Sequence, residues 1–376
     1  MRKIQMVDLH SQYEKIKSEI DEAISDVIKS TAFIKGAKVG EFASELASYL
    51  NVKHVIPCGN GTDALQIAIM SLGLKPSDEI ICPDFTFIAS AEVIGLLGYR
   101  PVFVDVDYDS FNVTAKNIEQ AISIKTKAII PVHLFGQAAP MEAILEIAKK
   151  YDLYVIEDTA QAIGADYIFS DGRKQKLGTI GTIGCTSFFP SKNLGCYGDG
   201  GALFTDDDEL AERLKMIANH GMKVRYHHDI LGVNSRLDTI QAAILSTKLK
   251  YLNRYEQARQ EAAKKYDDAF GNIDDLVIPK KETFSTHVYH QYTLKVKNGK
   301  RDDLRTFLEQ NDIPSMVYYP VPLHKQKAFL PIARQGGALN ISETLAEQVL
   351  SLPMHTELDE EQQAYIICKV REFFNK

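Results

Sequence analysis

The stretch HVIPCGNGTDALQIAIMSLGL (residues 54–74) joins a short apolar strand, a glycine-rich turn and a helical pattern. The same alternation continues to residue 206, and six further apolar runs lie at 79–83, 101–106, 128–132, 153–158, 185–189 and 201–205. Apolar strands separated by helices of about ten or more residues indicate a mostly parallel sheet with both faces covered. We therefore predict an α/β fold with a large, mostly parallel seven-stranded sheet, and we expect a ligand beyond the carboxyl ends of its strands.

The two flanks of this region follow other patterns. Residues 11–50 predict two helices joined by a loop at 33–40, which contains two glycines. After residue 236 we expect a long helix to about residue 270, then a strand, a helix, a proline-rich loop and a terminal helix at 289–296, 302–311, 319–323 and 359–375. We predict two domains, a large one formed by residues 1–250 and a smaller C-terminal α+β domain formed by residues 251–376.

Composition and charge exclude several classes of protein. The 376 residues are 45% hydrophobic and 25% charged, as in ordinary globular proteins. The net charge is −7 without a basic stretch, which argues against nucleic acid as a partner. No apolar run approaches the ~18 residues of a membrane span, and we see no signal peptide pattern at the N-terminus. Five cysteines without a C-x-x-C pair indicate reduced thiols, so we expect a cytoplasmic protein without a membrane span.

The glycine-rich turn offers a site for a phosphate group. In CGNGTDALQIAIM (58–70) a helix begins near Thr62, and the free N–H groups of a helix N-terminus favour anions. The Thr62 hydroxyl would be an additional donor. The segment matches neither G-x-G-x-x-G nor a P-loop, so the nucleotide-binding fingerprints do not apply. A simple turn with a helix cap is the alternative.

A carboxylate and a lysine follow two other predicted strands. Asp158, in the segment EDTAQ (157–161), is the last residue of the predicted strand at 153–158. A buried carboxylate at this position needs a cation, such as a protonated pyridine nitrogen. Capping of the next helix is the alternative. Lys192 lies in TSFFPSKNLG (186–195), where burial would favour the neutral amine that forms a Schiff base. A surface lysine is the alternative, and Ser187, five residues earlier, could bind a phosphate.

Two aromatic residues, Phe85 and Phe87, follow a further strand in PDFTFIAS (83–90). Either could stack on a flat cofactor, although an aromatic residue at such a position more often belongs to the core. Together the four segments supply a lysine for an aldehyde, a carboxylate for a pyridine nitrogen, a phosphate cup and an aromatic face. These are the groups that pyridoxal 5'-phosphate (PLP) requires, so we predict a PLP enzyme without a metal.

The segments GNGTDAL, P-x-F-T-F, EDTAQ, SFFPSKNLG and GDGG, in this order, resemble the DegT-type nucleotide-sugar aminotransferases. The resemblance extends over nearly the whole chain, from FIKG (33–36) to PLHKQ (322–326), and implies the fold of fold-type I PLP-dependent transferases. RYHHDILGVNSRLD (225–238), with SFFPSKNLGCYGDGG (187–201), is most similar to one branch of the family. Members of that branch aminate C3 of UDP-2-acetamido-3-oxo-glucuronate for surface polysaccharides such as lipopolysaccharide O-antigen.

The resemblance implies a role for each residue around the cofactor ring. Lys192 would hold PLP as a Schiff base and would move the proton during catalysis. Asp158 would pair with the pyridine nitrogen, and Gln161 would hydrogen-bond the ring hydroxyl oxygen. Phe87 would stack on the ring.

The resemblance also implies the residues around the phosphate and the sugar nucleotide. Gly61, Thr62 and Ser187 would bind the phosphate, and Asn234 of a neighbouring subunit would complete the cup. This correspondence implies a homodimer with shared active sites. Arg236 is placed to meet an anionic part of the sugar nucleotide, with a salt bridge at the interface as the alternative.

One departure from the family concerns the substrate side. Relatives commonly read H-Y-P where this chain has Tyr318, Tyr319 and Pro320. We expect both tyrosines near the sugar, and Tyr318 in place of histidine leaves the identity of the sugar open. We interpret Tyr226, together with the adjacent His227–His228 pair, as part of an interface or a substrate loop rather than as metal ligands.

The resemblance implies transfer of an amino group from L-glutamate to a UDP-linked keto sugar, with 2-oxoglutarate and the pyridoxamine phosphate (PMP) form of the cofactor after the first half-reaction. Amination at C4 of another nucleotide sugar is an alternative. A PMP-dependent sugar dehydratase is a further one, but such enzymes have histidine where this chain has Lys192. A non-catalytic regulator with the same fold is the third.

Overall fold

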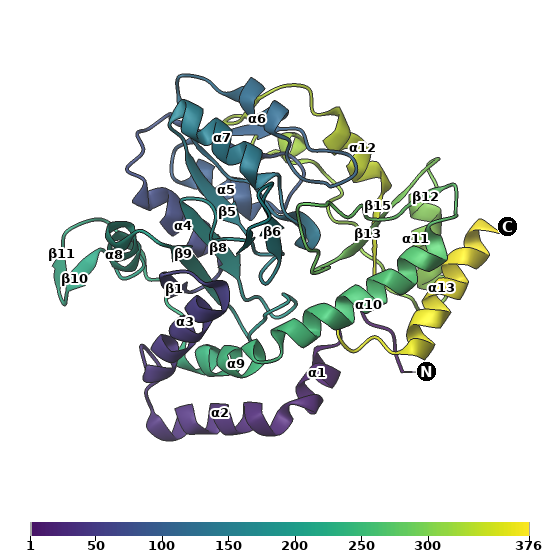
Figure 1. The fold of residues 1–376 in the computed structure, drawn as a ribbon, viewed down its shortest axis with the longest axis horizontal. Coiled ribbons are helices and arrows are strands. Elements are labelled where there is room, and N and C mark those ends of the chain that lie inside the picture. Colours follow the sequence, from purple (N-terminus) through teal and green to yellow (C-terminus); the bar gives the residue numbers. More distant parts are fainter. Residues whose placement is uncertain (1, 376) are drawn as a thin grey trace.

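The seven predicted strands are present in the computed structural model, which describes residues 2–375, and they form one sheet (Figure 1). They are β1 (His54–Cys58), β2 (Glu79–Pro83), β3 (Arg100–Val104), β4 (Thr126–Ile129), β5 (Tyr154–Asp158), β8 (Ile183–Ser187) and β9 (Gly201–Thr205). The strand order is β1-β9-β8-β5-β4-β2-β3-β14. Neighbours from β8 to β14 are parallel, whereas β9 is antiparallel to β8 and β1. The α/β prediction is confirmed.

The sheet has one strand more than the seven predicted. The added strand, β14 (Arg334–Gln335), comes from the C-terminal third and pairs with β3. Two nitrogen atoms of Arg334 donate to the Glu79 carboxylate at 3.0 and 2.8 Å, and one also donates to the carbonyl of Ala121 at 2.7 Å. A two-residue edge strand held by such contacts has no apolar pattern of its own, which is why the sequence did not predict it.

Both faces of the sheet are buried, as its continuous apolar strands require. The side chains of Ile80 and Cys82 belong to one core cluster and Ile81 to another, because successive side chains of a strand point to opposite faces. Helices α4 (Gly61–Ser71), α5 (Ala89–Leu96) and α8 (Asp208–Ile217) contribute to the first cluster. Helices α6 (Ala115–Ala121), α7 (Met141–Tyr151) and α12 (Asn340–Gln348) contribute to the second.

The N-terminal helices differ in detail from the prediction. Three helices are present, α1 (Leu9–Lys15), α2 (Lys17–Ser30) and α3 (Ala37–Leu50), because the chain leaves helical geometry at Ile16. Since α3 begins at Ala37, the second half of the predicted loop at 33–40 is helical. The long helix predicted after residue 236 is likewise divided, into α9 (Thr239–Leu249) and α10 (Leu252–Phe270). Helix α9 packs against α2 and α3.

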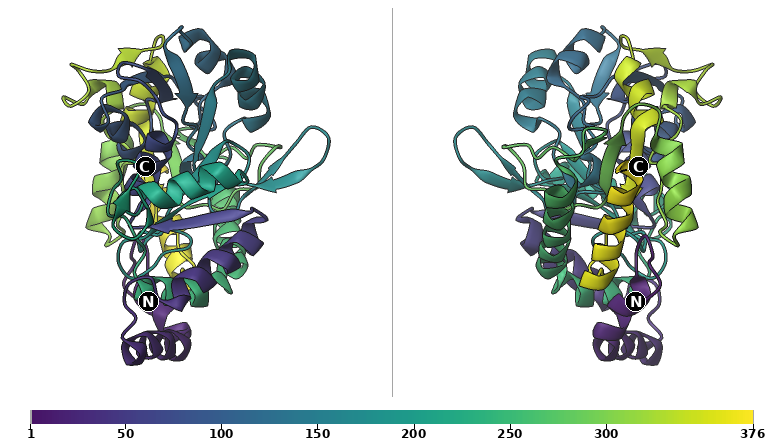
Figure 2. Two further views of the ribbon diagram at one scale, coloured as in Figure 1. Left: turned by 90° about the vertical axis from the view of Figure 1, so that its left-hand side faces the viewer. Right: turned by 90° about the vertical axis from the view of Figure 1, so that its right-hand side faces the viewer.

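The C-terminal region forms a small antiparallel sheet with helices beside it. The sheet contains β12 (Leu276–Val277), β13 (Tyr292–Val296) and β15 (Val349–Leu352). Figure 2 shows α13 (Glu360–Phe374) between α10 and α11 (Arg301–Gln310), and both neighbours contact it. The domain division at residue 250 remains a prediction: it falls between α9 and α10, but Ile4 packs in the C-terminal cluster and β14 joins the large sheet.

Two hairpins complete the elements. One contains β6 (Asp166–Ile168) and β7 (Lys174–Lys176), and the other contains β10 (Met222–Val224) and β11 (His227–His228). The second hairpin follows α8 and extends away from the sheet at the left of Figure 1. Among residues 2–375, no helix is long and apolar enough to cross a membrane.

Candidate active site

A cavity of about 800 Å³ opens beyond the carboxyl ends of the central strands, where an α/β sheet is expected to bind its ligand. One side of it comes from the large sheet: the first turn of α4, the loop after β2, the end of β5 and the loop after β8. The other side comes from two C-terminal segments, which contribute His290, Gln291, Tyr318 and Tyr319. The site thus combines distant parts of the sequence.

Lys192 lines this cavity from the loop after β8. The loop turns back sharply: the Lys192 N–H donates to the carbonyl of Phe189 at 2.8 Å, and a Cβ on Gly195 would lie 2.4 Å from the carbonyl oxygen of Pro190. Burial lowers the pKa of Lys192 to about 8, and the negative charge of Asp158 opposes this effect. A sizeable fraction of the amine is therefore neutral near physiological pH, as a nucleophile requires.

Asp158 ends β5 and its side chain is buried at the floor of the cavity. Its Oδ2 accepts a hydrogen bond from the Ser90 hydroxyl at 2.8 Å, and its Oδ1 accepts one from the Ala160 N–H at 3.1 Å. The Ala160 contact is a local turn of the kind expected for a cap, but the carboxylate also lines the cavity. It can therefore meet a cationic ligand group there.

The preceding residue, Glu157, is fully buried and does not line the cavity. Its oxygen atoms accept hydrogen bonds from the N–H groups of Gly178, Ile180 and Gly181, at 3.0, 2.7 and 2.6 Å, and contact the His133 ring at 3.0 Å. The two acidic residues of EDTAQ therefore have different surroundings. Glu157 ties loops together, and Asp158 is available to a ligand.

The start of α4 lies against the end of β8. A Cβ on Gly61 would lie 2.6 Å from the Cβ of Ser187, so only glycine permits this approach. The side chain of Asn60 caps the helix by accepting from the Asp63 N–H at 2.8 Å. Gly61, Thr62 and Ser187 all line the cavity. A helix N-terminus beside two hydroxyls suits a phosphate group.

An aromatic wall closes the cavity on the side of the β2 loop. Phe87 is 53% exposed in the described chain and lines the cavity, and its ring lies 6.2 Å from that of Tyr319. Phe85 is buried in the core, so the core interpretation holds for Phe85. Gln161 accepts from the Phe135 N–H at 2.9 Å and donates to the Tyr319 hydroxyl at 3.0 Å. Burial raises the pKa of Tyr319, which keeps the phenol neutral.

The structure gathers the predicted site residues around this cavity, with two exceptions, Asn234 and Arg236. The residue between them, Ser235, contacts the glycine-rich turn: its hydroxyl accepts a hydrogen bond from the Gly59 N–H at 2.8 Å. Asn234 is exposed, as a residue that acts on a neighbouring subunit has to be. The individual roles of the predicted residues remain predictions.

The residues Tyr226, His227 and His228 lie on the exposed β10–β11 hairpin. Within residues 2–375, no group of three or more His, Cys, Asp or Glu side chains could hold a metal ion.

His290 is a cavity residue that the sequence analysis missed. Burial and the positive charge of Lys192 hold the pKa of His290 well below its ordinary range, so its ring is neutral. Among the described residues, its buried Nδ1 has no hydrogen-bond partner. The sequence signal that could have indicated His290 is the pattern HVYHQY (287–292), in which histidines and tyrosines recur at the start of a predicted strand.

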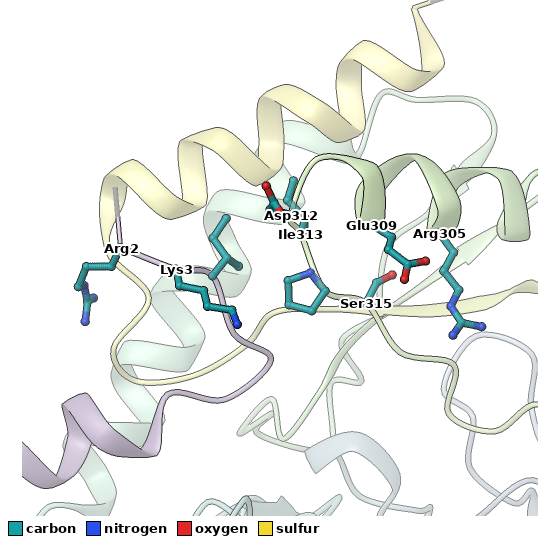
Figure 3. A pocket seen from close by; sticks show the side chains of 9 residues that line it. Arg2, Lys3, Arg305, Glu309, Asp312, Ile313 and Ser315 are labelled. Carbon is teal, nitrogen blue, oxygen red and sulfur yellow. The ribbon is translucent and has the colours of Figure 1, made fainter.

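A second hollow, of about 630 Å³, lies between the N-terminal segment and the end of α11 (Figure 3). It shares no residue with the first cavity and carries Arg305 together with Glu309, both on α11. Its lining combines acidic and basic side chains and contains no aromatic residue. Lys192, Asp158 and the glycine-rich turn all line the first cavity, which is therefore the candidate active site.

The residues of the first cavity fit PLP. The N-terminus of α4 at Gly61 lies beside the Thr62 and Ser187 hydroxyls and suits a phosphate group, the buried Asp158 carboxylate suits a protonated ring nitrogen, and Lys192 has the lowered pKa of an amine that reacts with an aldehyde. Lys192 would hold the aldehyde carbon, and bound PLP would supply a ring that withdraws electrons from the reacting carbon.

Comparisons with known proteins agree with this fit. The chain is 47% identical over 375 residues to a protein of Geobacillus stearothermophilus named pleiotropic regulatory protein, covering 99% of this chain and 98% of the relative. It is 46% identical over 356 residues to the UDP-2-acetamido-2-deoxy-3-oxo-D-glucuronate aminotransferase of Pseudomonas aeruginosa, covering 95% and 96%. It is 44% identical over 368 residues to the UDP-N-acetyl-3-dehydro-alpha-D-glucosamine 3-aminotransferase of Acidithiobacillus ferrooxidans, covering 98% and 97%.

Solved structures share the whole fold. Streptomyces venezuelae DesV, in complex with a ketimine intermediate, matches with a TM-score of 0.95 at 37% identity, covering 100% of both chains. The Bacillus subtilis ntda structure with bound PMP matches with a TM-score of 0.88 at 31% identity, covering 99% of this chain and 83% of the other. The family sequence model matches residues 14–371. The chain therefore belongs to the DegT/DnrJ/EryC1/StrS aminotransferase family, whose members are PLP-dependent.

Proposed function

We propose that this protein, a PLP-dependent aminotransferase of nucleotide-linked keto sugars, moves the amino group of L-glutamate to C3 of UDP-2-acetamido-3-oxo-glucuronate. The observation that carries the proposal is a cavity in which Lys192 and Asp158 lie together, in a chain more than 40% identical to two relatives named for UDP-linked 3-keto sugars. The product would serve the synthesis of surface polysaccharide such as O-antigen.

The cavity residues divide the proposed work among them. Gly61, Thr62 and Ser187 bind the phosphate, and Asp158 keeps the ring nitrogen protonated by offering a buried negative charge. Phe87 covers one face of the ring and Gln161 contacts its hydroxyl oxygen. These contacts fix the ring in one orientation before either substrate enters.

Lys192 performs the proton transfers. Its amine would take the proton from Cα of glutamate and pass it to the aldehyde carbon of the bound cofactor. In the second half-reaction it would take a proton from that carbon and deliver it to C3 of the sugar. One amine thus serves as nucleophile and as general acid and base, which its pKa of about 8 permits.

A panel of sugars tests the substrate. The protein is first converted to its PMP form with L-glutamate and freed of excess amino acid. It is then mixed with UDP-linked 3-keto and 4-keto sugars, each with and without a C6 carboxylate, and the recovery of the PLP absorbance is followed. We expect the fastest recovery with the 3-keto uronate. Preference for a 4-keto sugar would contradict the C3 assignment, and equal rates without the carboxylate would contradict the uronate.

The residues that we expect to contact the sugar nucleotide can be tested separately from those that bind the cofactor. We assign Arg236 to an anionic part of the sugar nucleotide and Tyr318 and Tyr319 to the sugar. The variant Arg236→Gln should raise the KM for the UDP-sugar and leave the KM for glutamate unchanged. An equal change in both would assign Arg236 to the protein scaffold.

A regulatory role is the second candidate, because one 47% identical relative is named a pleiotropic regulatory protein. The two candidates differ in a simple observation. An aminotransferase with bound PLP loses its visible absorbance when L-glutamate is added and yields one equivalent of 2-oxoglutarate. A yellow protein that glutamate leaves unchanged would favour the regulator.

We also propose that the protein acts as a homodimer in which Asn234 completes the phosphate site of the partner. Asn234 is exposed and lies outside the cavity of its own chain, which supports this assignment. Lys192→Ala and Asn234→Ala variants, each inactive or weak alone, should regain activity when mixed. A mixed dimer has one site with both native residues, provided that the two residues come from different chains. Failure of mixing to restore activity, with exchange of subunits verified, would refute the shared site.

A further inference from the structure

Asp84 and His324 connect two segments that lie 240 positions apart in the sequence. Asp84 follows β2 and is fully buried, and His324 follows the proline-rich loop at 319–323. The carboxylate accepts from the His324 backbone N–H at 2.8 Å and contacts the ring Nδ1 at 2.7 Å, while the Asp84 carbonyl accepts from the Leu323 N–H at 3.0 Å. Three contacts thus join one residue to the other segment.

The joined segments carry the aromatic wall of the active site. The loop after Asp84 contains Phe87 and leads to Ser90, whose hydroxyl donates to Asp158 at 2.8 Å. The segment before His324 contains Tyr319, which accepts from Gln161 at 3.0 Å and lies 6.2 Å from the Phe87 ring. Any movement of one segment relative to the other would therefore shift Phe87 and Tyr319 relative to Asp158.

The outer side of His324 is less firmly held. Its Nε2 contacts Glu343 at 3.1 Å, but Glu343 is 42% exposed and also pairs with Lys325 at 2.8 Å. Burial raises the pKa of Asp84, and the contacts from the His324 backbone N–H and ring oppose that rise. The inner contact is buried and the outer one is exposed to solvent, where ion pairs contribute little.

We propose that Asp84 and His324 are positioning residues, which hold the Phe87 and Tyr319 wall in place for the cofactor and do so through the inner contact alone. The proposal rests on the assignment of Phe87 and Gln161 to the cofactor ring. It predicts that the PMP form, which lacks the covalent bond to Lys192, depends on this contact more than the PLP form does.

Matched substitutions at position 324 separate the two sides of the ring. The amide nitrogen of asparagine in His324→Asn can occupy the place of Nδ1, and that of glutamine in His324→Gln the place of Nε2. The release of PMP and of PLP is measured by rapid ultrafiltration of the loaded protein. Hydrogen exchange of residues 316–326 is measured alongside, with β9 as the internal control. Neither measurement uses a sugar, so an error in the proposed sugar leaves both unchanged.

We expect His324→Ala and His324→Gln to release PMP about tenfold faster, the upper end of the effect of losing one ordinary hydrogen bond, and to exchange residues 316–326 faster. Release of PLP should change less than about threefold. His324→Asn and the control Glu343→Gln should stay within about twofold of the native protein. Equal acceleration of PMP and PLP release, unchanged exchange in His324→Ala, or rescue by glutamine instead of asparagine would each overturn the proposal. If the alanine variant does not fold, the asparagine and glutamine variants decide between the two outcomes.

Discussion

The two sides of the active-site cavity are built in different ways. On the sheet side, Gly61, Asp158 and Ser187 lie at a helix start or a strand end, so the backbone of the sheet fixes them. On the C-terminal side, Tyr319 and His324 are held by side-chain contacts with residues 158 and 240 positions away. The topology of the sheet thus places Gly61, Asp158 and Ser187, whereas side-chain contacts between distant segments place the aromatic wall opposite them.

The largest expected effect belongs to the sheet side. Lys192→Ala should reduce turnover about 10³-fold or more, because it removes both the nucleophile and the general base. After borohydride reduction of the PLP-saturated protein, mass spectrometry should find the label on Lys192 alone. Lys248 is an internal control, since it is buried and its pKa is also about 8, but it donates to the carbonyl of Gly195 outside the cavity. Label on Lys248, or turnover in the alanine variant, would refute the assignment.

A pH dependence sharpens the role of Lys192. Burial disfavours the charged amine and lowers its pKa to about 8, so protonation below that pH removes the nucleophile. The rate of PLP capture by the apoprotein should therefore rise with pH up to about 8 and then level off. At pH 8 the neutral fraction is roughly 100-fold larger than for an ordinary lysine. Stopped-flow absorbance measures the capture, and a rate that still rises steeply above pH 9.5 would contradict the lowered pKa.

An intermediate effect is expected at the phosphate end of the sheet side. Gly61→Ala places a methyl group against Ser187, and overpacking of this kind costs about 1–3 kcal/mol. We expect PMP to bind about tenfold more weakly, as measured by equilibrium dialysis. The control is Gly40→Ala in α3, where a Cβ meets nothing within 4 Å. That variant should bind PMP normally and unfold at a slightly higher temperature, because alanine favours a helix interior by ~0.5–1 kcal/mol. Equal effects of the two substitutions would remove the steric argument.

The smallest effect is expected on the C-terminal side. Tyr319→Phe removes the acceptor for the Gln161 side chain, a hydrogen bond worth ~0.5–1.5 kcal/mol. PMP release should accelerate by about two- to tenfold, while PLP remains bound through Lys192. Tyr318→Phe is the matched control, because the Gln161 hydrogen bond belongs to its neighbour. If Tyr319→Phe accelerated the release of PLP as much as that of PMP, the contrast between the two sides would fail.

Much of the sheet side could be predicted because its signals are local. The seven apolar runs correspond to the seven longer strands of the sheet. The glycine turn, EDTAQ and the lysine segment each follow a strand, so the sheet order alone brings them to one edge. Their chemistry could be inferred before their geometry was known.

The rest could not be predicted because its signals are not local. The breaks at Ile16 and between α9 and α10 carry no proline or glycine, so no local breaker signal marks them in the sequence. Edge strand β14 is held by the Arg334–Glu79 ion pair, and the HVYHQY pattern around His290 does not show that this residue enters the cavity. The PLHKQ segment is part of the family resemblance, but its sequence does not indicate that His324 contacts Asp84.

The sequence by itself determined the α/β class, seven of the eight strands of the sheet, and the identity of the lysine, carboxylate and glycine turn, since periodicity and short motifs act over a few residues. Only the tertiary structure decided which C-terminal residues oppose them, because contacts between residues 158 or 240 positions apart depend on how the whole chain packs. It also decided the surroundings of the two adjacent acids, since neighbouring side chains of a strand point to opposite faces: Glu157 is enclosed by the N–H groups of Gly178, Ile180 and Gly181, whereas Asp158 lines the cavity.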